Sequence, residues 1–179
     1  MTKKIDIKEV ITDKDYLAFV KFPFSLYKNN SYWVPPLIKD EIETLDPNKN
    51  PVYNNSSAKL FLAFRENKVV GRIAGIINWI EINEVKKNKV RFGWFDVIDD
   101  VEVSKCLLNR VIDYGKENNM ETIEGPVGFS NLDKAGLLIE GFKEPNTIIT
   151  LYNYPYYSLH LKKLNFKIAA KWVEYEIKI

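Results

Sequence analysis

The chain has 179 residues, of which 46% are hydrophobic, and its 26 basic and 24 acidic side chains leave a net charge of +2. This length supports one domain, spanning residues 1–179, with a full core. The nearly balanced charges give no broad field for nucleic acid or anionic lipid, and no apolar run reaches the roughly 20 residues that a membrane-spanning helix needs. With no secretory signal at its N-terminus and a single cysteine, Cys106, the protein is expected to be cytoplasmic and to bind neither nucleic acid nor a membrane.

The sequence contains few residues of the types that bind transition metals. Cys106 and the single histidine, His160, lie far apart in the chain, so they cannot form a zinc site with an ordinary ligand set. A magnesium site made of carboxylates alone stays open. No metal-binding residue is therefore assigned.

Alternation and capping signals predict the N-terminal elements. Residues Ile5–Ile11 alternate enough to form a first strand, and Thr12 or Asp13 can cap a helix that begins near Lys14. We expect Pro23 to interrupt this helix, because proline has no backbone N–H to donate. A strand and a broken helix should therefore open the chain.

A hairpin is the clearest local prediction. Two apolar runs, Lys59–Arg65 and Lys68–Asn78, are joined by a short polar turn and should pair as antiparallel strands. Gly71 and Gly75 in the second run indicate either a bulge, a close approach to the backbone, or a helix packed over glycine. Before the hairpin, Leu37–Leu45 is expected to form a short helix.

The chain is organised around a strand that leads directly into a long amphipathic helix. The strand is Arg91–Ile98, and its aromatic and β-branched residues predict burial on both faces. The helix should run from about Val101 to Lys116. Asp99 or Asp100 offers an N-cap, and Asp99 with Glu102 has the spacing of a capping box. Simple alternation places Phe92, Trp94, Asp96 and Ile98 on one face of the strand and Phe95 and Val97 on the other.

The C-terminal third alternates short strands with loops. Glu121–Gly125 is expected to be a short strand, and Asn131–Asn146 a structured loop with one helical turn, of a length that is often functional. Ile148–Tyr154 should be another strand and Tyr157–Leu164 a short helix. The last segment, Trp172–Ile179, alternates between apolar and charged residues and predicts a half-exposed strand.

This order of elements resembles the Gcn5-related N-acetyltransferase (GNAT) fold over essentially the whole chain. The stretches FPFSLYKNNSYWVPPLIKDEIETLDP, VVGRIAGIIN, RFGWFDVIDD, EGPVGF and LYNYPYY also resemble a poorly characterised bacterial group of that superfamily, whose members are commonly about twice this length. The resemblance implies an α/β (α+β) class, with a mixed, mostly antiparallel sheet, splayed central parallel strands and helices on both faces. It also implies that acetyl-CoA or another acyl-CoA binds at the splayed end of the central strand and delivers its acyl group to an amine.

The cofactor loop of this chain differs from the superfamily pattern. That pattern resembles Arg/Gln-x-x-Gly-x-Gly/Ala, whose glycines let backbone N–H groups hold the pyrophosphate. The corresponding residues 99–105 contain no glycine, and Lys105 is their single basic residue. The resemblance implies cofactor contacts from Phe95, Val97, Val101, Val103, Ser104, Lys105 and Asn153.

Three residues are candidates for catalysis. Asp96, desolvated among aromatics, is a candidate general base, although it could instead be tied into backbone or tyrosine hydrogen bonds. Glu140 in the long loop is a second candidate. The tyrosine that protonates the departing thiolate in the superfamily would fall near Leu161. Tyr156 and Tyr157, at the start of the short helix, are the possible substitutes, with Tyr156 as the assigned candidate and packing as the alternative for both. His160 is expected to be a surface or packing residue.

Two functions from different classes follow. The first is an acyl-CoA-dependent N-acyltransferase that acts on a small-molecule or peptide amine, with a second GNAT-like half or a second copy of the chain as its partner. The second is a non-catalytic binding or scaffolding domain that has lost coenzyme A. Asp99, Asp100 and Glu102 favour the second, because they would face the polyanionic pyrophosphate. Each like-charge contact at about 4 Å costs on the order of 4 kcal/mol at an effective dielectric near 20.

Overall fold

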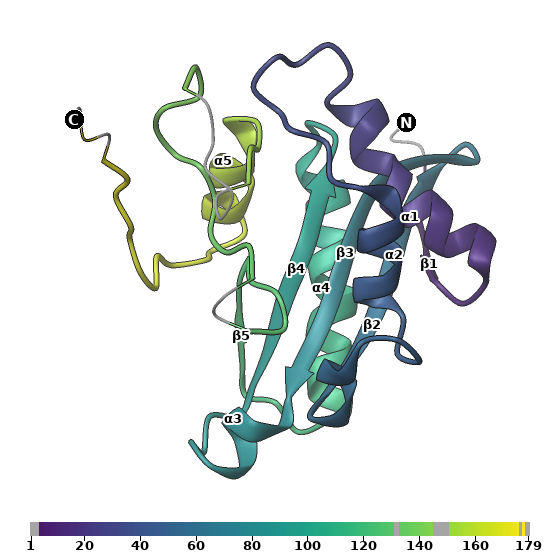
Figure 1. Ribbon diagram of the computed structural model, residues 1–179, viewed down its shortest axis with the longest axis vertical. Helices are drawn as coiled ribbons and strands as arrows, with labels where there is room; N and C mark the ends of the chain where they lie inside the picture. Colours follow the sequence, from purple (N-terminus) through teal and green to yellow (C-terminus); the bar gives the residue numbers. More distant parts are fainter. Residues whose placement is uncertain (1–3, 131–132, 145–150, 176, 178–179) are drawn as a thin grey trace.

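The computed structural model describes residues 4–130, 133–144, 151–175 and 177. Within these residues, five strands form one sheet in the order β1-β2-β3-β4-β5 (Figure 1). Neighbouring strands are antiparallel except for β4 and β5, which are parallel. The predicted α/β class, with a mixed and mostly antiparallel sheet, is confirmed.

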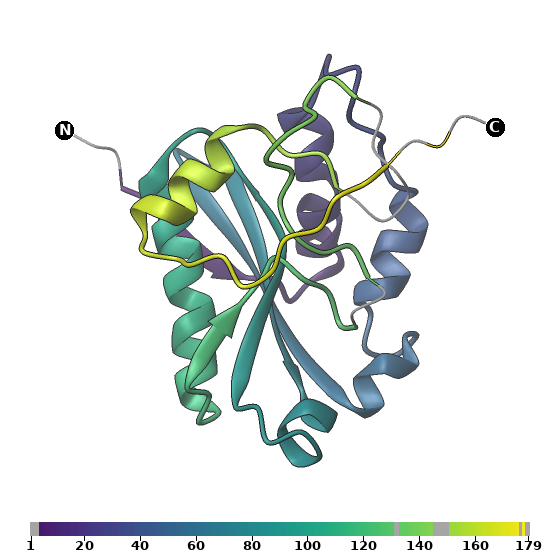
Figure 2. The same ribbon diagram turned by 90° about the vertical axis from the view of Figure 1, so that its left-hand side faces the viewer.

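Helices cover both faces of the sheet, as predicted. Figure 2 shows α1 (Asp13–Leu26) and α2 (Ile38–Leu45) on one side and α4 (Val101–Glu117) on the other. A separate apolar cluster fills the space on each side. The cluster of α1 and α2 includes Phe19, Val20, Leu45, Leu60, Leu62, Ala74 and Ile76, and that of α4 includes Phe61, Ile73, Phe92, Phe95, Val97, Val103, Leu107 and Val111.

The N-terminal elements match their predictions apart from the effect of one proline. After β1 (Asp6–Glu9), the Thr12 side chain caps α1 in a capping box with Asp15. Pro23 does not interrupt α1, which runs through it. A proline leaves the carbonyl four residues earlier without its helical donor, here Phe19. Arg72 supplies that donor from β3, with Nη1 3.0 Å from the Phe19 carbonyl oxygen.

The predicted hairpin is formed by β2 (Ser56–Arg65) and β3 (Lys68–Asn78). Its two turn residues, Glu66 and Asn67, have φ values of 50° and 62°, as a tight primed turn requires. A one-turn 3₁₀ helix, η1 (Pro51–Asn54), precedes the hairpin. A short helix, α3 (Trp79–Asn83), follows it.

The glycines of β3 allow α4 to pack closely on the sheet. A Cβ added at Gly71 would lie 2.8 Å from Leu107 Cδ1, and one at Gly75 would lie 3.1 Å from Tyr114 Cδ1. Both distances are shorter than ordinary contacts between carbon atoms. Of the predicted roles for these glycines, the structure therefore shows the helix packed over glycine.

Simple alternation along the central strand was a wrong expectation. β4 (Lys89–Val97) pairs Arg72 with Asp96 but Ala74 with Gly93, so β4 carries one extra residue at this point. Trp94, with φ of 44°, marks this bulge. Phe92 consequently belongs to the same apolar cluster as Phe95, while Trp94 packs on the side of α1 and α2.

The parallel strands separate beyond a short paired region. β5 (Thr122–Glu124) pairs with Lys89–Arg91 of β4. The chain then turns at Gly125, and the Val127 N–H still reaches the Phe92 carbonyl at 2.8 Å. β4 continues to Val97, where no β5 residue is opposite it. This separation is the predicted splay.

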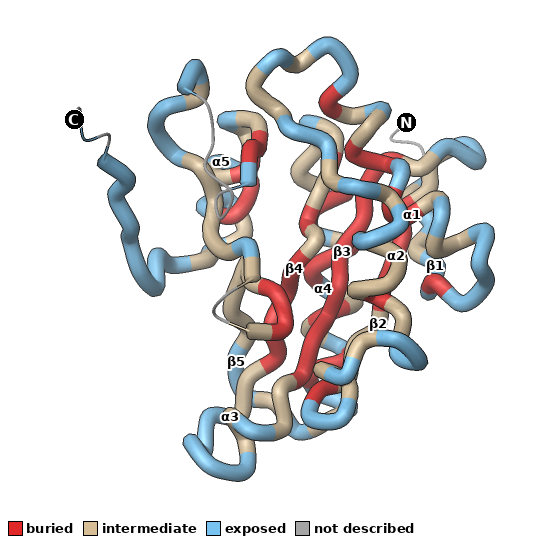
Figure 3. Tube along the Cα trace, viewed as in Figure 1, coloured by how far each residue is buried: buried red, intermediate tan, exposed pale blue. Residues whose placement is uncertain are grey.

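The C-terminal third differs from its predictions in two places. α5 (Tyr156–Lys163) is present as expected. The described residues 151–154 and 172–175 form no strand, while residues 148–150, 176, 178 and 179 lie outside the described part of the chain. The described loop residues 133–144 contain no helix, but they include a hydrogen-bonded turn in which the Glu144 N–H donates to the Gly141 carbonyl oxygen at 2.9 Å. Alternation makes a strand only beside a partner edge, and no described strand pairs with residues 172–175, which are exposed in Figure 3.

Candidate functional site

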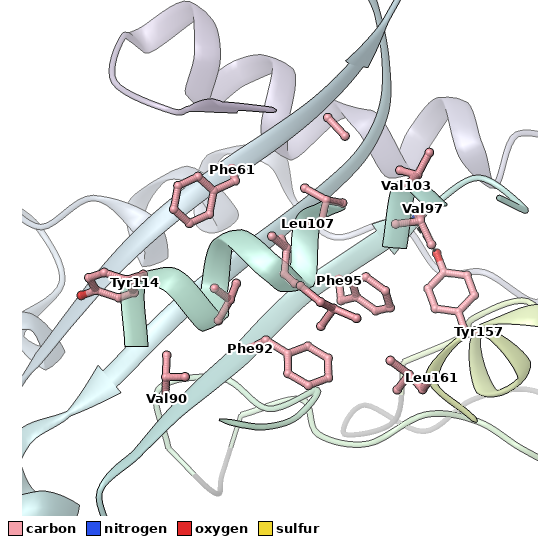
Figure 4. Close-up of a cluster of buried hydrophobic side chains, with 14 of the residues drawn as sticks. Phe61, Val90, Phe92, Phe95, Val97, Val103, Leu107, Tyr114, Tyr157 and Leu161 are labelled. Carbon is pink, nitrogen blue, oxygen red and sulfur yellow. Dashed lines mark hydrogen bonds between the residues drawn. The ribbon is translucent and has the colours of Figure 1, made fainter. Parts of the chain in front are cut away.

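The end of β4 at the splay is covered by two tyrosines of α5. The Tyr156 hydroxyl donates to the Val97 carbonyl oxygen at 2.6 Å, and the Val97 N–H donates to the Tyr157 hydroxyl at 3.0 Å. Figure 4 shows the Tyr157 hydroxyl directed at Val97. In a strand, the N–H and C=O of one residue face the same edge. Side chains of α5 therefore occupy the edge that the missing β5 partner leaves open.

Asp96 lies at the centre of a buried polar network. Its Oδ2 accepts from Arg72 Nε and Nη2, both at 2.8 Å. Its Oδ1 accepts from the hydroxyls of Tyr27 at 2.9 Å and Tyr157 at 3.3 Å. The Asp96 side chain is 14% exposed and that of Arg72 is 7% exposed. Asp96 is thus tied into tyrosine hydrogen bonds and an ion pair, and its role as a general base stays a prediction.

The tyrosines of this network are held in their neutral form. Burial, followed by the nearby Asp96 charge, raises the pKa of both Tyr27 and Tyr157 well above the ordinary value. Burial, followed by the Asp99 charge, raises the pKa of Tyr156 as well. Neutral phenols donate hydrogen bonds, so Tyr27 and Tyr157 act as donors to Asp96 and Tyr156 as a donor to the Val97 carbonyl oxygen.

A second cluster joins α5 to the start of α4. His160 Nε2 lies 3.1 Å from Asp99 Oδ1, and His160 Nδ1 lies 2.9 Å from Ser104 Oγ. A carboxylate only accepts, so Nε2 donates to Asp99 and, in the neutral ring, Nδ1 accepts from the Ser104 hydroxyl. The residue types are those of a hydrolase triad, but Ser104 is fully buried and no substrate carbonyl can reach it. We interpret the cluster as a contact between helices.

The connection between β4 and α4 is capped by its own carboxylate. The Asp100 side chain, not an Asp99–Glu102 capping box, is the N-cap of α4, accepting from the Glu102 N–H at 2.9 Å. Its other oxygen binds Arg65 Nη2 at 2.6 Å. These contacts, with Arg65 foremost, lower the pKa of Asp100. The helix N-terminus that would hold a pyrophosphate already binds an anion of the protein itself.

The structure brings some predicted site residues together and separates others. Asp96 and Tyr156 adjoin the Val97 edge. Asn153 is buried and bonds instead to both backbone groups of Leu138, at 2.7 and 3.2 Å. Glu140 is exposed in residues 133–144 and belongs to none of the contacts of the Asp96 network.

The remaining predicted cofactor residues divide between core and surface. The Phe95 and Val103 side chains are buried in the cluster under α4. Val101 and Lys105 line a groove of about 440 Å³ between α4 and residues 163–166. The Lys105 Nζ atom also lies 3.5 Å from Glu102 Oε2. This groove lies beside α4, and its lining does not include Val97 or the α5 tyrosines.

Sequence reasoning missed Tyr27, Arg72 and the role of His160. Arg72 was identifiable as the one charge within an apolar strand run, where a buried guanidinium needs a carboxylate partner. Tyr27 lies 69 positions from Asp96, and nothing in the sequence links the two.

Removing the cap should weaken α4 measurably. Asp100→Ala is expected to lower the free energy of unfolding by about 1–2 kcal/mol, because the N-cap and the Arg65 contact are lost together. Asp100→Asn, which keeps a capping oxygen, should lose less. Urea denaturation at pH 7 measures both differences. Equal stability of wild type and Asp100→Ala would contradict the assignment of the cap.

The pH dependence of this contribution has a defined sign. The pKa of folded Asp100 lies below its usual 3.8, so its contribution to stability is present above that value and is lost as the pH falls through the folded pKa. The stability difference between wild type and Asp100→Asn should therefore shrink when denaturation is repeated at pH values falling below 3.8. A difference that grows on acidification would contradict this sign.

Comparison with solved structures identifies the fold. A structure described as a predicted acetyltransferase of Clostridium acetobutylicum, with acetyl-CoA, aligns with a TM-score of 0.58 over 97% of this chain and 96% of that one, at 12% identity. An aminoglycoside acetyltransferase from an uncultured soil sample, in complex with sisomicin, aligns with a TM-score of 0.54 over 97% of both chains, at 13% identity. The chain has the Gcn5-related N-acetyltransferase fold, as the sequence resemblance implied.

Two curated bacterial proteins are similar in sequence. Protein YghO of Escherichia coli K12 is 30% identical over 172 residues, which are 94% of this chain and 44% of that protein. The bacterial ceramide synthase of Caulobacter vibrioides is 26% identical over 146 residues, which are 81% of this chain and 38% of that enzyme. The chain thus spans less than half the length of these relatives.

No family model matches the sequence. Within the described residues, no helix combines the length and the apolar character needed to cross a membrane.

Proposed function

We propose that this chain serves an acyl-CoA-dependent N-acyltransferase as a domain that keeps the acyltransferase fold but does not itself hold coenzyme A. The observation that carries the proposal is the hydrogen bonding of the Val97 backbone. An amide-bearing cofactor arm laid along the open edge of β4 would need a backbone donor and acceptor there. Both groups of Val97 are bonded to tyrosine hydroxyls, and Tyr157 is fully buried.

Electrostatics at the start of α4 support the same proposal. Asp100 already satisfies a backbone N–H of the first turn, and Asp99 and Glu102 add two further carboxylates nearby. A pyrophosphate would have to displace the Asp100 cap and remain close to the other two charges. Each like-charge contact at about 4 Å costs on the order of 4 kcal/mol at an effective dielectric near 20.

N-acyl transfer is proposed because of the relatives as well as the fold. A ceramide synthase joins a fatty acyl group to the amino group of a long-chain amino alcohol, and this chain is 26% identical to part of such an enzyme. The relatives contain more than twice the aligned length, which leaves room for a second domain that binds the acyl-CoA. The proposed acceptor class is therefore a long-chain amine.

Calorimetric titration of the 179-residue chain with acetyl-CoA tests the cofactor part. The expected result is no binding heat and no thermal shift at millimolar ligand. An assay of the thiol released from a long-chain acyl-CoA serves as a second readout on the same sample. Binding in the micromolar range would overturn the proposal, because the Val97 edge would then be accessible.

A second candidate, favoured by the similarity to ceramide synthase, is that the chain itself acylates the long-chain amine. Asp96 and Tyr156 would then be the base and the acid, as their positions beside Val97 allow. Incubation with a long-chain acyl-CoA and sphinganine should release free thiol in proportion to enzyme. Thiol release that Asp96→Asn abolishes would favour this candidate over the non-catalytic one.

A further inference from the structure

The C-terminal third contains a long stretch of sequence without acidic residues. No aspartate or glutamate occurs between Glu144 and Glu174. The same stretch contains four lysines, which are Lys162, Lys163, Lys167 and Lys171. Since the whole chain has a net charge of +2, the remainder of the chain is net acidic. The balanced total charge, from which no membrane contact was expected, therefore conceals a local basic segment.

The four lysine side chains are accessible to an external anion. Each of them is exposed. None of the ion pairs within the described residues includes any of the four, whereas lysines elsewhere, such as Lys49 and Lys105, pair with nearby glutamates. An anionic partner would therefore displace no internal carboxylate from these ammonium groups.

Large apolar side chains are exposed among these lysines. Leu159 on α5 and Val173 are exposed, and Ile168 and Trp172 are 71% and 73% exposed. Leu159 and Lys163 are four residues apart on α5, so they lie on the same side of that helix. Figure 2 shows α5 and the segment after it in front of one face of the molecule, and Figure 3 shows the segment in the colour of exposed residues. A surface that combines cations with apolar side chains suits a partner that has both anionic groups and hydrocarbon.

The segment after α5 is held against the body of the protein at two points. Leu164 and Phe166 pack against the apolar cluster under α4, and the Phe166 ring centroid lies 5.7 Å from that of Phe92. Farther along, a Cβ added at Gly136 would lie 3.3 Å from Trp172 Cζ3, so the indole ring lies beside the loop of residues 133–144. Because the segment already has these contacts, a partner has less of the chain to order on binding.

We propose that the outer face of α5 and residues 167–173 bind the surface of a membrane that contains anionic lipid. The lysine ammonium groups contact lipid phosphates, while Leu159, Ile168 and Trp172 enter the boundary between head groups and acyl chains. Tryptophan favours this boundary because its ring is apolar and its N–H still donates. Lysine extends its charge toward the phosphates while its alkyl chain lies among apolar groups.

This surface deepens the proposed function, on which the choice of a lipid partner partly rests. A long-chain amine has a large apolar part, which favours a bilayer over water. A domain that binds the membrane surface through α5 and residues 167–173 would therefore be located where such an acceptor is concentrated.

Flotation with lipid vesicles tests the surface directly. The 179-residue chain should bind vesicles of equal parts phosphatidylglycerol and phosphatidylcholine, and should not bind vesicles of phosphatidylcholine alone. Binding to the anionic vesicles should weaken in about 1 M NaCl, where the Debye length is about 3 Å.

A charge-reversal variant tests the lysines. Lys167→Glu combined with Lys171→Glu should weaken binding to the anionic vesicles by at least about 25-fold, because each lysine near such a surface contributes about fivefold. The matched control is Lys86→Glu combined with Lys87→Glu. It makes the same change in charge at exposed positions after α3, which lies at the opposite end of the molecule from α5 (Figure 1), and it should lose much less.

Trp172 provides a second readout, the depth of insertion. The chain has four tryptophans, so the contribution of Trp172 is found by difference. Brominated lipid should quench part of the wild-type fluorescence, and this part should be absent in Trp172→Phe, which keeps an aromatic ring and should still bind. Trp172→Ser should bind at least about tenfold more weakly, because it removes the apolar ring.

The outcomes separate this proposal from the proposed function. Failure to bind anionic vesicles, or an equal loss in the two double variants, would overturn the membrane surface. Equally strong binding to a single-stranded oligonucleotide, unaffected by Trp172→Ser, would also overturn it, because the lysines alone would then explain the binding. Since these measurements contain no acyl-CoA, each of these results leaves the proposed function standing. Binding of acetyl-CoA by the chain would overturn the proposed function and leave the vesicle result unchanged.

Discussion

Replacing Arg72 with methionine is expected to lower the free energy of unfolding by about 3–5 kcal/mol, the range found when one partner of a buried ion pair is removed. The change removes both guanidinium donors of the buried Asp96 carboxyl group and leaves two phenols as its remaining donors. It also removes the donor that compensates the Phe19 carbonyl above Pro23. Guanidinium denaturation of wild type and variant measures the difference.

A double-mutant cycle separates the ion pair from the rest of this effect. Asp96→Asn in the Arg72→Met background removes the unpaired charge, so the double variant should recover part of the loss. The two changes should couple by about 0.5–3 kcal/mol, as groups in one network do. A loss below about 1 kcal/mol for the single variant, or simple additivity of the two, would contradict the network.

Leu107→Ala is expected to destabilise the protein by about 2–5 kcal/mol. Leu107 is fully buried under α4, and its Cδ1 fills the space above Gly71. Leu159→Ala is the matched control, since Leu159 is 57% exposed on α5 and its loss should change stability by at most about 0.5 kcal/mol.

Gly71→Ala tests the same contact from the other side. Alone, it should cost about 1–3 kcal/mol through overpacking against Leu107. Combined with Leu107→Ala, the added methyl group enters the space that the leucine left, so the double variant should be more stable than the sum of the single changes predicts. Strict additivity in thermal or urea unfolding would show that α4 moves away from β3 instead.

Local patterns predicted most of the elements because the relevant forces act between near neighbours. The Thr12 cap, the tight turn at Glu66 and Asn67, and the periodicity of α4 all depend on residues within a few positions of one another. The glycine spacing in β3 also indicated helix packing as one alternative. These features required no knowledge of what lies opposite in the fold.

The errors occurred where a distant partner decides the outcome. Pro23 remains helical because Arg72, 53 positions from Phe19, bonds the freed carbonyl. The bulge at Trp94 is defined by pairing with β3, so alternation along β4 alone misplaced Phe92. The expected strand at Trp172–Ile179 had a valid pattern but no described edge to join.

The candidate site was predicted in composition but not in arrangement. Asp96 and Tyr156 were identified and do adjoin the splayed end of β4. Their partners Tyr27 and Arg72 come from other elements, and the contact of His160 with Ser104 spans 56 positions. Because hydrogen-bond partners across such separations depend on the packed fold, single-residue chemistry could not assign them.

The tyrosine contacts at Val97 also bear on self-association. A strand edge with free N–H and C=O groups is a template on which another molecule can add a strand and begin aggregation. Hydroxyl groups that bond to Val97 satisfy its backbone without offering a further row of donors and acceptors. The sheet therefore cannot grow by strand addition at Val97, so α5 protects the protein from intermolecular β-pairing there.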